Sequence, residues 1–471
     1  MAYNKKAHLR DNIEAIRLMF RLEKEQRTAT PEEAGILAAY SGFGGIKAVL
    51  SPFGKLTDIL RWTQADRELF PLITELHNVL RDGAADEREY KRLVESVKAS
   101  TFTAFYTPPA IIDAIASSLG EHGVSPGRFL DPSSGTGNFV SAFQPQCYSA
   151  SGNSPEMVTY EKDLLTGRIL SRLHPEAQVN IKGFEELPPH RNGYFDVVSS
   201  NIPFGDIRIF DPSFDNGTAR RFALNTLHNY FFVKGLDAVR EGGILAFITS
   251  QGVLDAPSNA PIREYMMRNA NLVGVARLPN NLFTDNAGTE VGSDLIILQK
   301  NSGKNGELYY NEKLFMQTEQ TPIGTSVNGY VWSISSLSNT DLIRGTDPYG
   351  KPAYQLLHRG GIGQMAEDLR EHLKIELHQF DKELYEMYSL HPAQGKSTVT
   401  ETISTPVVTP EIQPRNEMAA KPEAVTPQPE EEKSEIEPRR PDYSEGVQLS
   451  LLDLWGMTEE VRKQEAPSKK K

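Results

Sequence analysis

Residues 129–139 read Phe-Leu-Asp-Pro-Ser-Ser-Gly-Thr-Gly-Asn-Phe, which predicts a buried strand, a tight glycine turn and the first turn of a helix. Glycines let a backbone pass close to a ligand, and the free N–H groups at a helix start favour a polar or anionic group. Turns between a strand and a helix also contain glycine for steric reasons alone. This stretch therefore predicts the local fold and leaves the ligand open.

A second strand, expected at residues 158–160, ends in the carboxylate of Glu161. In doubly wound folds an acidic residue about 20 residues after the glycine turn binds ribose hydroxyls. The two successive strand ends therefore predict a ligand that resembles a nucleoside.

A third strand, expected over residues 194–200, runs into Asn201-Ile202-Pro203-Phe204-Gly205. The side-chain oxygen of Asn201 and the carbonyl of Ile202 can each accept one N–H of an exocyclic amine, and Phe204 can stack on its ring. Pro203 holds the preceding residue extended, which directs its carbonyl. A strand followed by an ordinary proline turn is the alternative interpretation.

Together these motifs resemble the N6-adenine DNA methyltransferases that use S-adenosyl-L-methionine, in the class whose cofactor motif precedes the catalytic motif. The family pattern is Asn-Pro-Pro-Tyr or Asn-Pro-Pro-Phe, and this chain has Ile202 at the second position. The family uses the carbonyl of that residue, so isoleucine is compatible with the chemistry. Asn-Ile-Pro-Phe-Gly is also similar to the variant in methylase modules of methylase–helicase proteins of phages and conjugative elements. The resemblance covers roughly residues 35–300 and implies a bacterial mobile element as the setting.

The resemblance implies specific roles for matching residues. The segment 106–108 borders the methionine end of the cofactor in the family, with a structural helix cap as the alternative, and residues 184–185 lie at the strand end that meets the cofactor's adenine, with a solvated loop as the alternative for Glu185. The implied catalytic residues are Asn201, Ile202, Pro203 and Phe204. The implied cofactor contacts are Tyr106, Thr107, Pro108, Asp131, Ser133, Gly135, Gly137, Asn138, Phe139, Glu161, Phe184 and Glu185.

The order of the predicted elements favours an α/β fold with a doubly wound, mostly parallel, seven-stranded Rossmann-like sheet. By resemblance, the last strand, expected at residues 294–299, is antiparallel to its neighbour. We expect four parts: a helical N-terminal region (1–100), the methyltransferase domain (101–302), a small β element with an amphipathic helix (303–391), and a tail (392–471). The small β element is expected to include residues 308–310 and 330–334, and the amphipathic helix spans 365–388.

Composition limits the remaining possibilities. The chain has 471 residues, 39% hydrophobic and 24% charged, and a net charge of −12, which argues against a non-specific DNA coat but is compatible with a local basic cleft. No apolar run is long enough to span a bilayer, so we expect a soluble cytoplasmic protein with no membrane partner. The single cysteine, Cys147, excludes an internal disulfide and a zinc cluster, and no metal is expected.

The polar loop after the catalytic motif contains Arg208, Arg220 and Arg221, which can pair with DNA phosphates or form a solvated surface.

A second segment and a single phenylalanine also have one functional and one structural interpretation. Residues 40–45, Tyr-Ser-Gly-Phe-Gly-Gly, line the cleft or simply link two helices, and Phe283 lines the pocket for the target base or packs in the core. The predicted recognition element is small, so sequence specificity is low or comes from the N-terminal helices or a partner.

The tail is rich in proline and glutamate, which predicts disorder, and contains one apolar island at residues 447–455. Within it, Gln448, Leu449, Leu451 and Leu452 resemble the pentapeptide by which bacterial replication and repair proteins bind the sliding clamp. A terminal helix that packs on the protein itself is the alternative. No phosphate-loop motif is present, so a helicase partner would be a separate chain.

The predicted activity is methyl transfer to the N6 amine of an adenine flipped out of DNA. Methylation of an RNA adenine or a protein glutamine is the alternative within enzymes, because an Asn-x-Pro-aromatic motif suits all three substrates. A catalytically weak DNA-binding accessory protein, bound to the clamp, is the alternative in a different class.

Overall fold

The fold is built on one seven-stranded sheet in the order β3-β2-β1-β4-β5-β7-β6. The computed structural model describes residues 4–389, apart from 52, 54, 104–105, 149–153, 204, 206, 215–216, 285–290, 334–336 and 348–349. The strands are β1 Arg128–Asp131, β2 Glu156–Tyr160, β3 Gln178–Asn180, β4 Phe195–Asn201, β5 Val239–Ser250, β6 Ala270–Leu278 and β7 Ser293–Lys300. The first five are parallel, and β7 is antiparallel to both of its neighbours. The predicted doubly wound sheet, including its antiparallel last strand, is confirmed.

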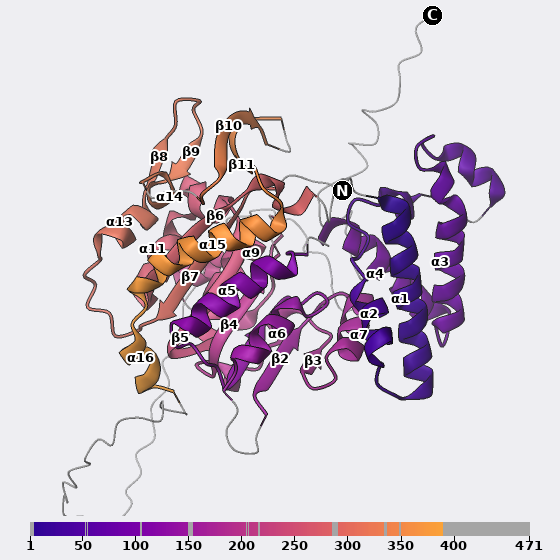
Figure 1. Cartoon of the computed structure of the whole chain (residues 1–471), viewed down its shortest axis with the longest axis horizontal. Helices are drawn as coiled ribbons and strands as arrows, with labels where there is room; N and C mark the ends of the chain where they lie inside the picture. The colour runs from indigo at the N-terminus through magenta and orange to yellow at the C-terminus, as the bar shows by residue number, and fades with distance from the viewer. Residues whose placement is uncertain are drawn as a thin grey trace, which may run out of the picture. The chain divides into compact units, whose positions relative to one another are not determined.

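Helices cover both faces of the sheet (Figure 1). Successive side chains of a strand point to opposite faces, so Phe129 and Val197 join one core while Leu130 and Val198 join the other. The first core includes residues of α5 Pro109–Glu121, α6 Asn138–Phe143 and α15 Ile362–Glu376. The second includes residues of α9 Leu227–Ala238 and α11 Ala260–Asn269.

The N-terminal region forms a third core. Its helices are α1 Lys5–Glu25, α2 Pro31–Ala38, α3 Phe70–Gly83 and α4 Glu87–Thr103, with short 3-10 turns between α2 and α3. They pack on α7 Leu164–Leu173, which contributes Leu165 and Ile169 to this core. The helices expected in this region are therefore present, and they are joined to the sheet through α7.

The turn at residues 40–45 is held from two sides. The buried side chain of Asn12 accepts a hydrogen bond from Ser41 N–H at 2.9 Å and donates one to the carbonyl of Gly42 at 2.5 Å. The N–H of Phe43 donates to Ser100 Oγ at 3.3 Å. The segment thus links α2 to the rest of the helical region, as one of its two interpretations proposed.

Strand β5 begins at Val239, and its pairing with β4 shifts between Val239 and Ile244, with Gly242 at a φ of +71°. The amphipathic helix expected at 365–388 is three pieces, α15, a 3-10 turn at Leu377–Gln379 and α16 Lys382–Met387. The break is stabilised by Asp381, whose carboxylate accepts the N–H of Leu384 and starts α16.

The region after the sheet also differs from expectation. Residues 308–310 precede or start a helix, α13 Tyr310–Met316, and residues 330–333 belong to α14 Gly329–Ser333. The β structure lies instead in two hairpins, β8 Thr318–Gln320 with β9 Ser326–Asn328, and β10 Thr340–Thr346 with β11 Pro352–His358.

All the described residues belong to one compact unit, and the proposed division at residues 100, 302 and 391 stays a prediction. The predicted disordered tail and its apolar island lie outside the described residues. Among the helices that the structure describes, none has the length and apolar character needed to cross a membrane.

Candidate active site

The glycine turn lies at the carboxyl end of β1. Gly135 and Gly137 have φ values of +54° and +91°, a region that favours glycine. A side chain at Gly135 would clash with the ring of Tyr106, so this ring lies directly against the turn. The structure therefore brings the segment 106–108 to the turn, as the resemblance implied.

Asp131 has one satisfied and one unsatisfied carboxylate oxygen. Its Oδ1 accepts the hydroxyl of Ser200 at 2.7 Å and the N–H of Ser133 at 3.2 Å. Its Oδ2 is buried and has no hydrogen-bond partner among the described residues. Burial raises the pKa of Asp131 to about 7. A cationic or hydrogen-bond-donating ligand would satisfy this oxygen.

Glu161 is fixed by two backbone donors. Its Oε2 accepts the N–H of Gly135 at 2.8 Å, and its Oε1 accepts the N–H of Asp163 at 2.7 Å. Burial, with the charge of Asp163 as the next cause, raises the pKa of Glu161 to about 8. Each carboxylate oxygen can accept a second hydrogen bond, so the pair of ribose hydroxyls predicted from the sequence can be bound here.

The predicted catalytic motif begins where β4 ends. Asn201 pairs with Ile248 of β5, and the next residue, Ile202, continues this pairing because its N–H donates to the carbonyl of Ile248 at 2.9 Å. The side chain of Ile202 is buried in the core, only 1% exposed. Pro203 is half-buried, and Phe204 lies outside the described residues.

The first predicted catalytic residue, Asn201, adjoins a residue that is hydrogen-bonded to the end of β1. Ser200, whose hydroxyl binds Asp131, directly precedes Asn201. The end of β4 is therefore hydrogen-bonded to the residue that ends β1, its neighbour in the sheet. Ser200 was not among the predicted site residues, although its place beside Asn201 at a strand end was a usable signal.

Three residues predicted to contact the cofactor are either buried in the core or paired with another side chain. Phe184 is 1% exposed and packs with Phe231 at a centroid distance of 5.2 Å. Phe139 is buried in the core beneath the turn. Glu185 is partly exposed and pairs with Lys162 at 3.0 Å. The two phenylalanines thus contribute packing beside the site, and their contact with the cofactor stays a prediction, as does that of Glu185.

The loop arginines differ from one another. Arg220 donates two hydrogen bonds to Asp237, at 2.9 and 2.8 Å, and its guanidinium lies over the ring of Phe214. This pairing engages Arg220 within the protein, and its contact with phosphate stays a prediction. Arg208 is exposed, and Arg221 lies on α8 Thr218–Ala223. Phe283 is buried in the core, which was one of its two interpretations.

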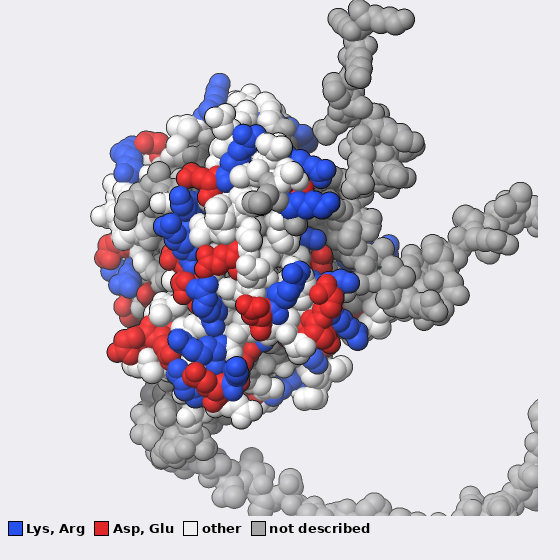
Figure 2. All heavy atoms as spheres, turned by 90° about the vertical axis from the view of Figure 1, so that its right-hand side faces the viewer, with Lys and Arg blue, Asp and Glu red and all other residues white. Residues whose placement is uncertain are grey.

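Charged side chains on the N-terminal helices are mixed in sign. Figure 2 shows basic and acidic groups interspersed on the face that contains these helices. Several are paired, including Arg17 with Glu75 and Arg27 with Glu33. A phosphate backbone is bound by a surface of positive charge, so this face does not resemble a DNA-binding surface.

Two residues that support the site were not predicted. The hydroxyl of Ser96, on α4, donates to Asp163 Oδ1 at 2.6 Å and accepts the N–H of Leu165 at 3.0 Å. Asp163 also caps α7 through the N–H of Thr166. Because the N–H of Asp163 binds Glu161, the N-terminal helices are connected to the predicted ribose-binding carboxylate through two hydrogen bonds.

Residues 90–323 match the family model described as N-6 DNA Methylase. The match covers just under half of the chain. Among curated proteins, this chain is similar to Defense against restriction protein B of Escherichia phage P1, with 28% identity over 263 residues. The match covers 54% of this chain and 11% of that relative, so the chain spans about a tenth of the relative's length.

Solved structures of methyltransferases are also similar to this chain. One is described as a class I S-adenosylmethionine-dependent methyltransferase from Listeria monocytogenes, with 15% identity and a TM-score of 0.39 over 65% of this chain and 91% of that one. Another is the type I restriction-modification methyltransferase subunit from Streptococcus thermophilus, with 18% identity and a TM-score of 0.35 over 63% and 79%. The M protein of the type I restriction enzyme EcoKI has 12% identity and a TM-score of 0.35 over 82% and 93%.

The cofactor is S-adenosyl-L-methionine, and the residues present fit it. The unsatisfied Oδ2 of Asp131 suits the ammonium group of its methionine part, and the Oγ1 of Thr107, also buried without a partner among the described residues, suits the adjoining polar atoms. Glu161 has acceptor capacity for the ribose. Among the described residues no cluster of side chains could hold a metal ion.

Proposed function

We propose that this protein methylates the N6 amine of an adenine in DNA. The observation that supports the proposal best is the hydrogen bond between Ser200 and Asp131, which joins the strand end before Asn201 to the cofactor turn. An acceptor pair for an amine then lies beside the residues that fit the methyl donor. The family model that matches residues 90–323 points to the same activity.

The chain's residues would act on the amine through hydrogen bonding. An adenine amine is a poor nucleophile because its lone pair is delocalised into the ring. When the side-chain oxygen of Asn201 and the carbonyl of Ile202 accept its two N–H bonds, the nitrogen can move toward tetrahedral geometry. The same oxygens stabilise the positive charge that develops on it. S-adenosylmethionine, when bound, supplies the electrophilic methyl group.

The target base must leave the duplex to reach Asn201. Stacking on Phe204 would offset part of the few kcal/mol that unpairing costs. The exposed Arg208 and the helix that contains Arg221 follow the catalytic motif in sequence, and their guanidinium groups are the proposed contacts with the phosphates of the extruded strand.

The proposal is tested by incubating the protein with tritiated S-adenosylmethionine and unmethylated DNA. Asn201→Ala is the test variant, and Asn192→Ala, at an exposed position just before β4, is the matched control. We expect label in DNA adenine with the unmutated protein and the control, and a loss of at least about 100-fold in transfer with Asn201→Ala, at unchanged cofactor affinity.

Other outcomes would overturn the proposal. Label in RNA or in protein glutamine, and not in DNA, would assign a different substrate. Cofactor binding without any transfer would indicate the accessory role.

For partners, we propose that the sliding clamp of a bacterial host binds the motif at residues 448–452, which lies outside the described residues. Gln448→Ala with Leu452→Ala should abolish binding to purified clamp in a sedimentation or surface-binding assay, while methyl transfer to free DNA stays unchanged. Clamp binding that survives both substitutions would contradict this assignment. A separate helicase chain and a bacterial mobile element as the source are proposed from the resemblance alone. A cytoplasmic location is proposed from the sequence.

A further inference from the structure

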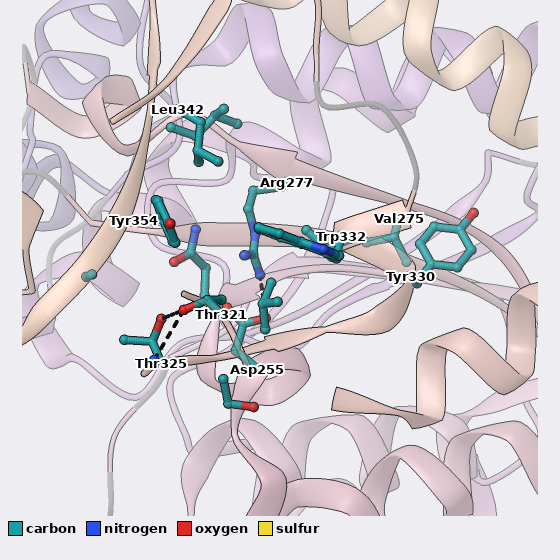
Figure 3. A pocket seen from close by; sticks show the side chains of 15 residues that line it. Asp255, Val275, Arg277, Thr321, Thr325, Tyr330, Trp332, Leu342 and Tyr354 are labelled. Carbon is teal, nitrogen blue, oxygen red and sulfur yellow. Dashed lines mark hydrogen bonds and ion pairs between the residues drawn. The ribbon is translucent and has the colours of Figure 1, made fainter. Parts of the chain in front are cut away.

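A cavity of about 450 Å³ lies between the sheet and the two hairpins that follow it. Its floor includes Gln251, Asp255 and Arg277, and its walls include Trp332 and Tyr354. Figure 3 shows the two aromatic side chains on opposite sides of Arg277. The cavity thus combines flat apolar walls with a polar floor, the combination found in sites for planar ligands with polar edges.

The cavity lies on the edge of the sheet where the catalytic motif begins. Gln251 directly follows β5, and Asn201 pairs with Ile248, three residues before it. With a rise of about 3.3 Å per residue and about 4.8 Å between strands, Gln251 lies on the order of 10 Å from Asn201. Successive nucleotides of one stacked strand are about 3.4 Å apart, so a strand with its target base at Asn201 passes this cavity within a few nucleotides.

The two aromatic walls are not stacked on each other and are partly exposed to solvent. The ring centroids of Trp332 and Tyr354 are 6.3 Å apart and their planes are tilted by 48°, so the two rings are not stacked on each other. Trp332 is 45% exposed and the neighbouring Leu342 is 54% exposed. Large apolar side chains left in contact with solvent around a cavity indicate a surface that binds a partner.

The charged side chains on the floor of the cavity disfavour the binding of a phosphate group. The guanidinium of Arg277 donates to Asp294 at 2.8 and 3.0 Å and to Asp255 at 2.9 Å. Two carboxylates therefore balance one positive charge, and no surplus positive charge remains for an anion. The ligand group that enters is neutral or bears hydrogen-bond donors.

The floor also offers unused hydrogen-bonding atoms. The Oδ1 of Asp255 accepts hydrogen bonds from Arg277 and from the N–H of Asn328, both at 2.9 Å. Its Oδ2 and the amide of Gln251 have no hydrogen-bond partner among the residues that the structure describes. Neither has the buried Oγ of Ser326, which also lines the cavity. An exocyclic amine and ring nitrogens of a nucleobase match this mixture of acceptors and donors.

We propose that this cavity binds a nucleobase of the strand being methylated, a few nucleotides from the target adenine, by stacking on Trp332 and Tyr354 and by hydrogen bonds to Gln251 and Asp255. The inference rests on the proposed function for the identity of the strand. It assigns to the hairpin region a role in sequence preference.

Trp332 itself provides a direct test. The chain has three tryptophans, so Trp62→Phe with Trp455→Phe leaves Trp332 as the single fluorescent reporter without altering the cavity. We expect single-stranded oligodeoxynucleotides to quench its fluorescence on saturation, and an abasic strand of equal length and charge to leave it unchanged. Quenching by an arginine-containing peptide and not by DNA would overturn the proposal in favour of a protein partner.

Variants measure the contribution of the walls. Tyr354→Ala should weaken binding of base-bearing strands by about tenfold, the loss of one base stack, and leave the abasic strand unaffected. Tyr310→Ala is the matched control, because Tyr310 is 77% exposed and lies outside the cavity. Gln251→Leu should reduce the differences in affinity among strands that differ at one base. Unchanged cofactor affinity and cooperative unfolding show that each variant is folded.

The two proposals fail in different ways. Transfer of label that depends on Asn201, with no quenching of Trp332 and with Tyr354→Ala indistinguishable from Tyr310→Ala, would overturn the nucleobase site and leave the methylation proposal standing. Base-dependent quenching without transfer to DNA would support the site and contradict the methylation proposal.

Discussion

Isoleucine at position 202 gives the catalytic strand end a hydrogen bond that proline cannot form. The N–H of Ile202 donates to the carbonyl of Ile248, and its side chain fills the core between β4 and α9. The carbonyl of Ile202, which the proposed mechanism uses, does not depend on this substitution. The substitution therefore changes the backbone nitrogen and the side chain of residue 202, and the proposed methyl transfer uses neither of them.

Restoring the family's proline should cost stability. Ile202→Pro removes the N–H donor, leaves the carbonyl of Ile248 unpaired and shortens a buried side chain, so we expect the free energy of unfolding to fall by about 2–4 kcal/mol. The control Ile202→Val keeps the donor and should cost about 1 kcal/mol. Urea unfolding measures both, and a proline variant as stable as the valine variant would contradict the importance of this hydrogen bond.

The raised pKa of Glu161 should make cofactor binding depend on pH. The ribose hydroxyls need an acceptor, and with a pKa of about 8 the carboxyl is mostly protonated at pH 7. As the pH increases toward about 8, the contribution of Glu161 to cofactor affinity should therefore increase by up to tenfold for each pH unit. Above about pH 8 this contribution should level off. Calorimetric titration from pH 6 to 9 measures this dependence.

Glu161→Gln isolates the contribution of this group. The amine of S-adenosylmethionine also titrates near pH 8, but it does so equally with both proteins. The variant should bind more weakly and lose the part of the pH dependence that is specific to Glu161, while Glu186→Gln, at an exposed neighbouring carboxylate, should keep it. Identical pH profiles for all three proteins would show that Glu161 does not bind the ribose.

At the residue scale, sequence reasoning located those site residues whose positions follow from strand ends. Asp131, Glu161 and Asn201 each directly end or follow a predicted strand, and parallel strands bring such ends together. The position of Arg220 could not be found in this way, because its partner Asp237 lies on α9 and only the tertiary structure brings the two together.

At the element scale, the contact between α4 and α7 connects the helical region to the cofactor site. Ser96 binds both the carboxylate of Asp163 and the N–H of Leu165, so one hydroxyl completes the start of α7. An unpaired buried carboxylate oxygen would follow from its loss.

Ser96→Ala should lower the free energy of unfolding by about 1–3 kcal/mol and also weaken cofactor binding, because Asp163 positions Glu161. Ser171→Ala is the control, since that hydroxyl binds only the carbonyl of Gly167 within the same helix. Chemical unfolding and cofactor titration of the two variants give the comparison. Equal effects of the two substitutions would show that the connection to Glu161 has no influence.

Periodicity predicted the sheet well but not the elements after it. The strands of the sheet are buried on both faces and read as continuous apolar runs. The run Tyr330-Val331-Trp332 suggests a strand by composition, yet Asn328 accepts the N–H of Tyr330 and binds the carbonyl of Phe315, which turns the chain into α14. Local propensity was outweighed by these contacts with α13.

At the scale of the whole molecule, two cores share one sheet, and the core of the N-terminal helices joins them through α7. Leu165 and Ile169 of α7 are fully buried by the N-terminal helices. Removing those helices would expose this apolar face and delete Ser96.

A chain that begins at residue 101 should therefore lose cofactor binding and aggregate. It lacks the helices that bury about two large apolar side chains of α7, and it lacks the hydroxyl of Ser96 that binds Asp163. A chain that ends at residue 391 should bind the cofactor as the full chain does. Size-exclusion chromatography and cofactor titration of both chains check this, and normal binding by the first chain would contradict the role given to the helical region.

The strand order also imposes an order of events while the chain is being made. The place between β5 and β6 belongs to β7, which is synthesised after both. Until Lys300 has left the ribosome, each of the two earlier strands has an open edge, an interval on the order of seconds at roughly 5–20 residues per second. A nascent chain stopped before Ser293 therefore presents two hydrogen-bonding edges to any neighbouring strand, and its risk of incorrect pairing ends only when β7 closes the gap.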